Sequence, residues 1–131
     1  HMITGKTTDL LGPCAALLLN ALKELAGIPH SQPVISPAAI EPIQTLKTQY
    51  LGSKNPRLHM DEVLIALSVS AASDPNAQKA LEQLPNLKGC QAHTSVMVSD
   101  VDRKLFMKLS IQATFEAKYE NNSVIFPKKG I

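Results

Sequence analysis

Apolar side chains recur at helical spacing over the first two thirds of the chain. They predict a helix that begins at Gly12-Pro13 and ends at Gly27, because proline suits the first helical position and glycine the position after the last. Alanine and leucine cover this segment on nearly all sides, so we expect it in the middle of the domain or in an interface. Further helices are predicted at 36–52, with an interruption at Pro42, at 61–73 and at 74–84.

The last third of the chain changes to a period of two. Alternating apolar and polar residues predict strands over 92–98 and 111–117, with a helix between them from Ser99 to about Leu109. A strand, a helix and a strand in this order predict a βαβ unit. Shorter strand signals lie at 2–6 and 33–35. The expected fold class is α/β: a small mixed sheet of three to five strands covered by about five helices.

The chain has 131 residues, the length of one domain. We place this α/β domain at residues 3–120 and expect it to be cut from a longer protein, because the chain opens on residues that resemble the end of a strand. Residues 1–2 are interpreted as a cloning remnant, and 121–131 as a tail or an edge strand.

The composition excludes several classes of protein. The net charge is +2 and the basic residues are scattered, which is not the clustered basic face typical of nucleic-acid binding. The longest apolar run, 15–19, is far shorter than the ~20 residues of a membrane span. Two cysteines without a CxxC motif favour a reduced, cytoplasmic protein. We therefore expect neither a nucleic-acid nor a membrane partner.

The densest polar cluster lies at 54–62 and leads into the predicted third helix. An arginine can bind a phosphate or carboxylate through two parallel bonds, and a helix N-terminus adds free N–H groups. The candidate ligand-binding residues are Lys54, Asn55, Arg57, His59, Asp61 and His93. The alternative is a structural loop in which Asp61 or a neighbour caps the helix, because acidic residues stabilise a first helical turn.

Metal chemistry is a weaker interpretation of the same residues. His59, Asp61, Glu62 and His93 carry nitrogen and oxygen atoms that could bind a metal in a hydrolase. Their spacing matches no diagnostic metal motif, so no metal and no cofactor are predicted.

Nucleophilic catalysis is another alternative, because Cys90, His93 and Ser95 cluster around one predicted strand. Ordinary sheet packing of His93 and Ser95 on one face explains them equally. The segment Thr4–Thr7 is similar to the end of a phosphate-binding loop, although its β-branched start favours a plain strand-to-helix turn. No catalytic residue is assigned.

Longer stretches carry a family resemblance: Thr4–Thr7, Ala16–Ile28, Ile40–Gln44, Leu51–His59, Asp61–Ser68 and Leu87–His93. Over about residues 3–120 the chain resembles the C-terminal domain of bacterial uncharacterised protein family 0371, a domain of unknown function (DUF1846). The resemblance implies a much longer parent protein, bacterial and cytoplasmic, whose larger N-terminal α/β part holds a glycine-rich, nucleotide-like segment. It implies no catalytic residues.

These observations lead to two hypotheses about function. The first is a non-catalytic interaction module that packs on the N-terminal part of the parent and on other subunits of a homo-oligomer. The apolar helix at 13–26 motivates it. The alternative is a half-site for an anionic or phosphorylated small molecule at the domain junction, in an enzyme that the N-terminal part completes. Whether the parent is an enzyme stays open.

Overall fold

A computed structural model describes residues 2–6, 8–95, 98–116 and 122–126. Along the chain the elements are β1 (Ile3–Lys6), α1 (Pro13–Leu25), α2 (Pro37–Thr45), the π-helix η1 (Leu46–Tyr50), α3 (Met60–Ala71), α4 (Pro75–Leu81), the 3-10 helix η2 (Leu84–Leu87), β2 (Gln91–Thr94), α5 (Asp100–Lys108), β3 (Gln112–Phe115) and β4 (Asn122–Phe126). The predicted α/β class with a small mixed sheet is confirmed.

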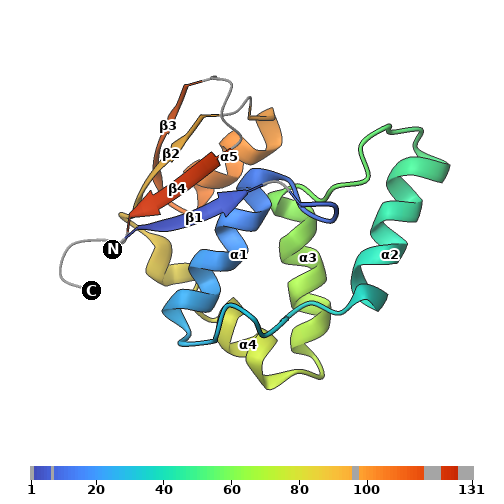
Figure 1. Ribbon diagram of the computed structural model, residues 1–131, viewed down its shortest axis with the longest axis horizontal. Coiled ribbons are helices and arrows are strands. Elements are labelled where there is room, and N and C mark those ends of the chain that lie inside the picture. Colours follow the sequence, from blue (N-terminus) through green and yellow to red (C-terminus); the bar gives the residue numbers. More distant parts are fainter. Residues whose placement is uncertain (1, 7, 96–97, 117–121, 127–131) are drawn as a thin grey trace.

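The four strands form one sheet in the order β1-β4-β2-β3 (Figure 1). β2 and β3 are parallel and joined by α5, as the βαβ prediction requires, whereas β4 runs antiparallel to both β1 and β2. The sequence predicts a tail or an edge strand at 121–131; within this range residues 122–126 form β4, which is an interior strand and not an edge strand, and residues 121 and 127–131 lie outside the described residues. This short apolar run lies inside the sheet, where Ile125 pairs with Ile3 on one side and Ala92 on the other.

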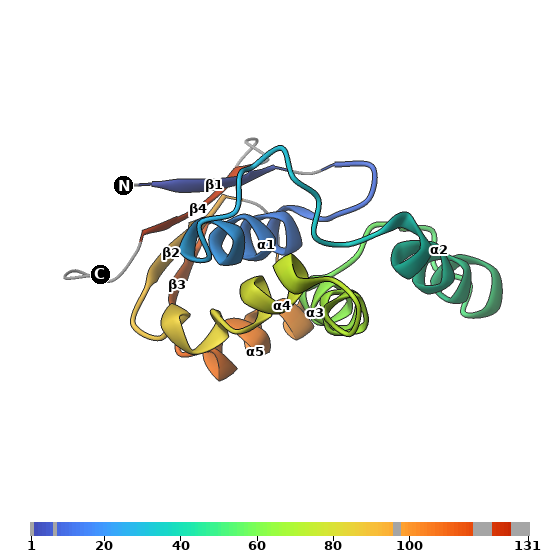
Figure 2. The same cartoon turned by 90° about the horizontal axis from the view of Figure 1, so that it is seen from below.

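In the part of the chain that the structure describes, the helices cover only one face of the sheet. α1 packs on β1 and β4, and α5 packs on β3. α3 and α4 contact α1 in turn, so α1 lies between the sheet and these two helices (Figure 2). α2 and η1 project at the edge of the molecule, away from the strands (Figure 1). We call the uncovered side of the strands the open sheet face.

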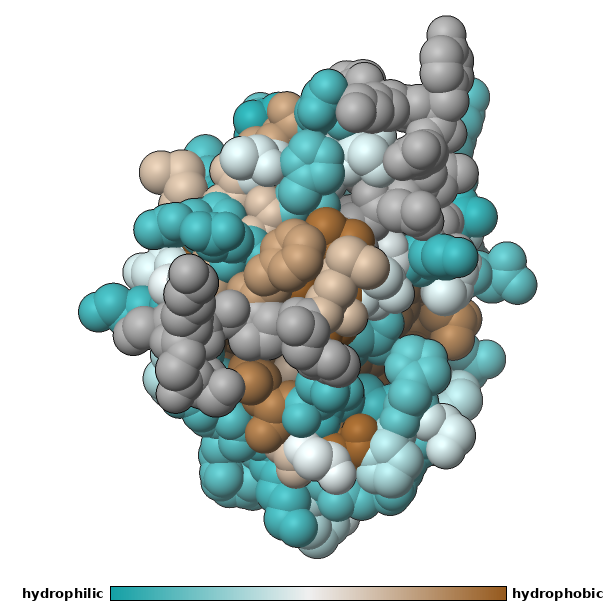
Figure 3. Space-filling model, turned by 60° about the vertical axis from the view of Figure 1, so that its left-hand side comes forward, coloured by the Kyte–Doolittle hydropathy of each residue, from teal (hydrophilic) through white to brown (hydrophobic). Residues whose placement is uncertain are grey.

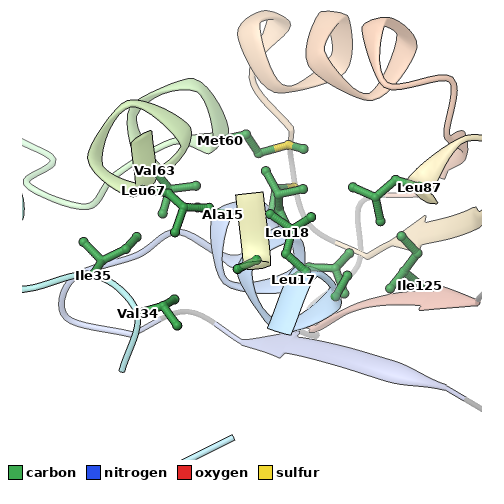
Figure 4. Close-up of a cluster of buried hydrophobic side chains, with 14 of the residues drawn as sticks. Ala15, Leu17, Leu18, Val34, Ile35, Met60, Val63, Leu67, Leu87 and Ile125 are labelled. Atoms are coloured by element: carbon green, nitrogen blue, oxygen red, sulfur yellow. The ribbon is translucent and has the colours of Figure 1, made fainter. Parts of the chain in front are cut away.

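α1 forms the centre of the core. Leu17, Leu18 and Leu22 are buried, and Figure 4 shows Leu17 and Leu18 beside residues of the sheet and of the helices on the far side. The nearly all-round apolar pattern of this segment is thus satisfied inside the domain. Burying one such leucine contributes roughly 1.5–3 kcal/mol.

A glycine lets α1 approach β1 closely. A Cβ atom at Gly5 would lie 2.4 Å from the backbone nitrogen of Leu17, a distance that no methyl group can occupy. The segment Thr4–Thr7, similar in sequence to a phosphate-binding loop, is strand up to Lys6, and Thr7 lies outside the described residues. Gly5 therefore serves close packing in this fold.

The segment between α1 and α2 contains no strand, so the prediction at 33–35 was wrong. Val34 and Ile35 are buried as parts of an irregular segment, which explains why their sequence is apolar. Lys23, in the last turn of α1, holds this segment by donating from Nζ to the carbonyl of His30 at 2.8 Å. Burial lowers the pKa of Lys23.

The helix predicted from residue 36 continues past its internal proline. Pro42 lies within α2, and the α-helical hydrogen-bond pattern continues to Thr45. The π-helix η1 begins at Leu46. Lack of an N–H at Pro42 removes one helical hydrogen bond, but the bonds on either side keep the helix intact.

Candidate functional site

The polar cluster surrounds the beginning of α3, which starts at Met60 with His59 as its N-cap. Glu62 Oε1 accepts the backbone N–H of His59 at 2.8 Å, and Asp102 Oδ1, from α5, accepts that of Met60 at 3.0 Å. Two carboxylates of the chain therefore occupy the positive end of this helix, where a bound anion would otherwise be favoured. Asp61 lies in the first turn and is exposed.

Two cations, Lys47 on η1 and Arg57 within the cluster, bind neighbouring segments of the protein. The buried Lys47 donates from Nζ to Glu62 Oε1 at 2.9 Å and to the carbonyl of Arg57. The guanidinium of Arg57 donates from Nε to the carbonyl of Thr8 at 2.7 Å and so connects this loop to the segment before α1. These contacts favour a structural role for both side chains.

Asp102 is the buried carboxyl of this network. Its side chain is buried, and burial raises its pKa above the ordinary value. The negative charge of Asp61 adds to the rise, whereas the N–H of Met60, the charge of His59 and the hydroxyl of Ser99 oppose it. His59 Nδ1 lies 3.8 Å from Asp102 Oδ2, an ion-pair distance when the histidine is protonated.

The structure brings only part of the predicted ligand set together. Arg57, His59 and Asp61 lie around the start of α3, and Lys54 and Asn55 are exposed in the preceding loop. Asn55 Oδ1 accepts the backbone N–H of Arg57 at 3.1 Å. His93 lies on β2, on the face of the sheet opposite to the helices, because its neighbours along the strand point into the core. Ligand binding by this set stays a prediction.

Replacement of Arg57 separates the structural from the ligand-binding interpretation. Arg57→Ala removes the hydrogen bond to Thr8 and should lower the free energy of unfolding by about 1 kcal/mol, measured by urea denaturation. Lys54→Ala, at an exposed position in the same loop, should change it by less than about 0.5 kcal/mol. An unchanged stability in Arg57→Ala, together with loss of a phosphate-induced rise in Tm, would instead support the ligand site.

His93 belongs to a second cluster, on the open sheet face. Its Nδ1 lies 2.8 Å from Thr114 Oγ1, and its Nε2 lies 4.0 Å from Glu116 Oε2. The sequence pattern did not single out Thr114 and Glu116 as partners of His93. A signal was present, since the two strands of a βαβ unit are often adjacent and His93 and Thr114 hold polar positions in both.

The structure also places the residues of the other chemical interpretations. Cys90 is buried in the core, and Ser95 follows the end of β2 and is buried, whereas His93 is half-buried on the open face. Within residues 2–6, 8–95, 98–116 and 122–126, no three histidine, cysteine, aspartate or glutamate side chains gather as a metal site would require. In the same part of the chain, none of the helices has the length and apolar character to cross a membrane.

The fold and these two clusters define an α/β domain whose sheet carries helices on one face. The start of α3 in this domain is capped by two carboxylates of the chain. The chain belongs to the family described as "Domain of unknown function DUF1846, C-terminal", whose sequence profile matches residues 1–125. The predicted family membership is confirmed. The match extends beyond the predicted limit at 120 and includes most of β4.

The chain is similar to several bacterial proteins, each called a UPF0371 protein. It is 58% identical over 124 residues to one from Corynebacterium efficiens, covering 95% of this chain and 25% of that protein. It is 58% identical over 123 residues to one from Corynebacterium diphtheriae, covering 94% and 25%. A protein of Streptococcus thermophilus is 46% identical over 120 residues, covering 92% and 24%. The chain thus spans about a quarter of the length of these relatives.

Proposed function

We propose that this domain is a non-catalytic interaction module that packs on the N-terminal part found in its longer relatives. The observation that carries the proposal is the distribution of exposed apolar side chains. Among the residues that the structure describes, ten large hydrophobic side chains are exposed, and five of them lie on η1, directly after η1 or on α3: Leu46, Tyr50, Leu51, Ile65 and Val69. We call these five residues the helical apolar surface.

The exposure at this surface is large where η1 projects. Tyr50 is 77% exposed and Leu51 is 72% exposed. Single exposed apolar residues are ordinary on soluble proteins, but three of them within residues 46–51 are a concentration typical of an interaction site. The helix from 13 to 25, which motivated the same hypothesis from sequence, cannot provide this site because it is buried at the centre of the domain.

The relatives provide the expected occupant. Three quarters of each relative lies outside the matched region, and the family description places the matched region at the C-terminal end. A covalently linked neighbour is present at high effective concentration, so it needs little contact area to remain docked. A second copy of the chain is the competing occupant.

The test compares the domain alone with a chimera in which it replaces the C-terminal quarter of the Corynebacterium efficiens relative. Tyr50→Cys is introduced in both, and its alkylation rate is followed by peptide mass spectrometry; Cys14 and Cys90 are buried and give little background. We expect alkylation in the chimera to be slower by about tenfold or more, which corresponds to a protecting free energy of about 1.4 kcal/mol.

Lys79→Cys, at an exposed position on α4, is the matched control and should react equally fast in both proteins. Equal rates at position 50 in the two proteins would contradict the proposal. Protection of position 50 in the isolated domain that increases with protein concentration would assign the surface to a second copy instead.

A further inference from the structure

The open sheet face has a hollow on its β2–β3 half, away from the helical apolar surface. The hollow has a volume of about 370 Å³ and is lined by Gln91, His93, Gln112, Thr114 and Phe126. Figure 3 brings the strands forward and shows apolar groups in the middle of this side with hydrophilic residues around them. Binding sites for small organic molecules typically have about 300–1,000 Å³. We call this hollow the His93 groove.

The sheet register separates apolar from polar side chains in the groove. Phe126 on β4 stands opposite Gln91 on β2, which stands beside Gln112 on β3. In the next row Val124 stands opposite His93. The β4 side therefore presents an aromatic ring and a branched aliphatic chain, and the β2–β3 side presents two amides and an imidazole. A flat molecule can stack on the first and hydrogen-bond through its edge to the second.

The contact between His93 and Thr114 suits either tautomer of the neutral imidazole, and one of the two presents an acceptor to the groove. In that tautomer the Thr114 hydroxyl donates to the carbonyl of Ala92, at 3.4 Å, and its oxygen accepts from His93 Nδ1 at 2.8 Å. In the neutral imidazole the proton is then on Nδ1, which leaves Nε2 as an acceptor. Glu116 Oε2, 4.0 Å away, is also an acceptor. One amino group can donate a proton to each of two acceptors at this separation.

We propose that the His93 groove binds a planar nitrogen heterocycle of the nucleobase kind that carries an exocyclic amino group. The ring lies against Phe126, and the amino group donates to His93 Nε2 and to the carboxylate of Glu116. The side-chain amides of Gln91 and Gln112 each offer a donor and an acceptor, the combination that pairs with the edge of a base. This use of a sheet surface follows the general way in which aromatic and amide side chains hold unstacked bases.

The test is a titration of the ¹⁵N-labelled chain with single nucleosides, followed by NMR. Adenosine, guanosine and cytidine carry the amino group, uridine lacks it, and phenol supplies an aromatic ring alone. We expect saturable shifts at the amides of Gln91, His93 and Gln112 with at least one amino-bearing nucleoside, and weaker binding of uridine and phenol. No saturable shift at these residues with any nucleoside would overturn the proposal, and so would equal binding of uridine or phenol.

Matched glutamine variants test whether the groove itself binds. Gln112→Ala should weaken binding by about fivefold, as expected for one lost hydrogen bond. Gln49→Ala makes the same change at an exposed position on η1 and should leave binding unchanged. Equal effects of the two variants would overturn the proposal. In the chimera, the groove amides could be shielded from solvent and show no shift with any nucleoside. This result would assign the groove to a polypeptide and would also overturn the proposal.

Discussion

Replacing Gly5 by alanine should remove about 3 kcal/mol or more of the free energy of unfolding, because overpacking against backbone cannot be relieved by a side-chain rotation. The added Cβ would lie 2.4 Å from the nitrogen, 2.5 Å from the Cα and 2.6 Å from the Cβ of Leu17. To accommodate it, α1 must move away from β1, and α1 is the element that the sheet, α3 and α4 all contact. Urea denaturation followed by circular dichroism measures the loss.

Gly12→Ala is the matched control for this substitution. A Cβ there would meet only the carbonyl oxygen of Leu58, at an ordinary distance of 3.6 Å. Gly12 is the N-cap of α1, so its replacement should cost about 1 kcal/mol or less. A Gly5→Ala variant as stable as Gly12→Ala would show that α1 does not pack on β1 as closely as described.

Replacing Asp102 by alanine should give the second largest loss, about 2 kcal/mol, because it leaves a buried N–H without an acceptor. Asp102 Oδ1 accepts the backbone N–H of Met60 and thereby connects α5 to the start of α3. Asp102→Asn keeps an oxygen acceptor in this place, so it should be more stable than Asp102→Ala at neutral pH. Equal losses in the two variants would contradict the capping role.

The pH dependence of Asp102 has a defined sign. Burial raises the pKa of this carboxyl in the folded protein above its ordinary value of 3.8. At pH values between 3.8 and this raised pKa, the folded state therefore binds more protons than the unfolded state. The contribution of Asp102 to stability therefore decreases as pH rises through this window and is constant above it. The difference in unfolding free energy between the wild type and Asp102→Asn should follow this course. A difference that increases with pH would contradict it.

Helices and strands whose signals lie in neighbouring positions of the sequence could be predicted from local patterns. The proline and glycine at either end of α1 and the alternation around β2 and β3 were sufficient to identify these elements. Val34 and Ile35 were misassigned to a strand because buried irregular segments and short strands have the same apolar composition. The position of β4 could not be predicted, since a short apolar run contains no information about which strands it pairs with.

The candidate site was predicted less completely because its key contacts join distant residues. The polar character of the 54–62 segment was visible, but its partners Lys47 and Asp102 come from other elements. His93 was singled out with Ser95, its near neighbour in sequence, whereas the hydroxyl in contact with its ring is that of Thr114 on the parallel strand. Pairing across strands became visible only once their register was known.

The interior position of β4 sets the order in which the domain can be completed during synthesis. Among the described strands, β1 pairs with β4 alone, and the β2–β3 pair is connected to β1 only through β4. On the ribosome, α1 can cover β1 early, but the two halves of the sheet stay separate until residues 122–126 have emerged. Closure then joins Ile3 to Ile125, a pair far apart in the sequence, and non-local pairings of this kind form slowly. Within this domain, the first strand is thus the one that waits longest for its partner.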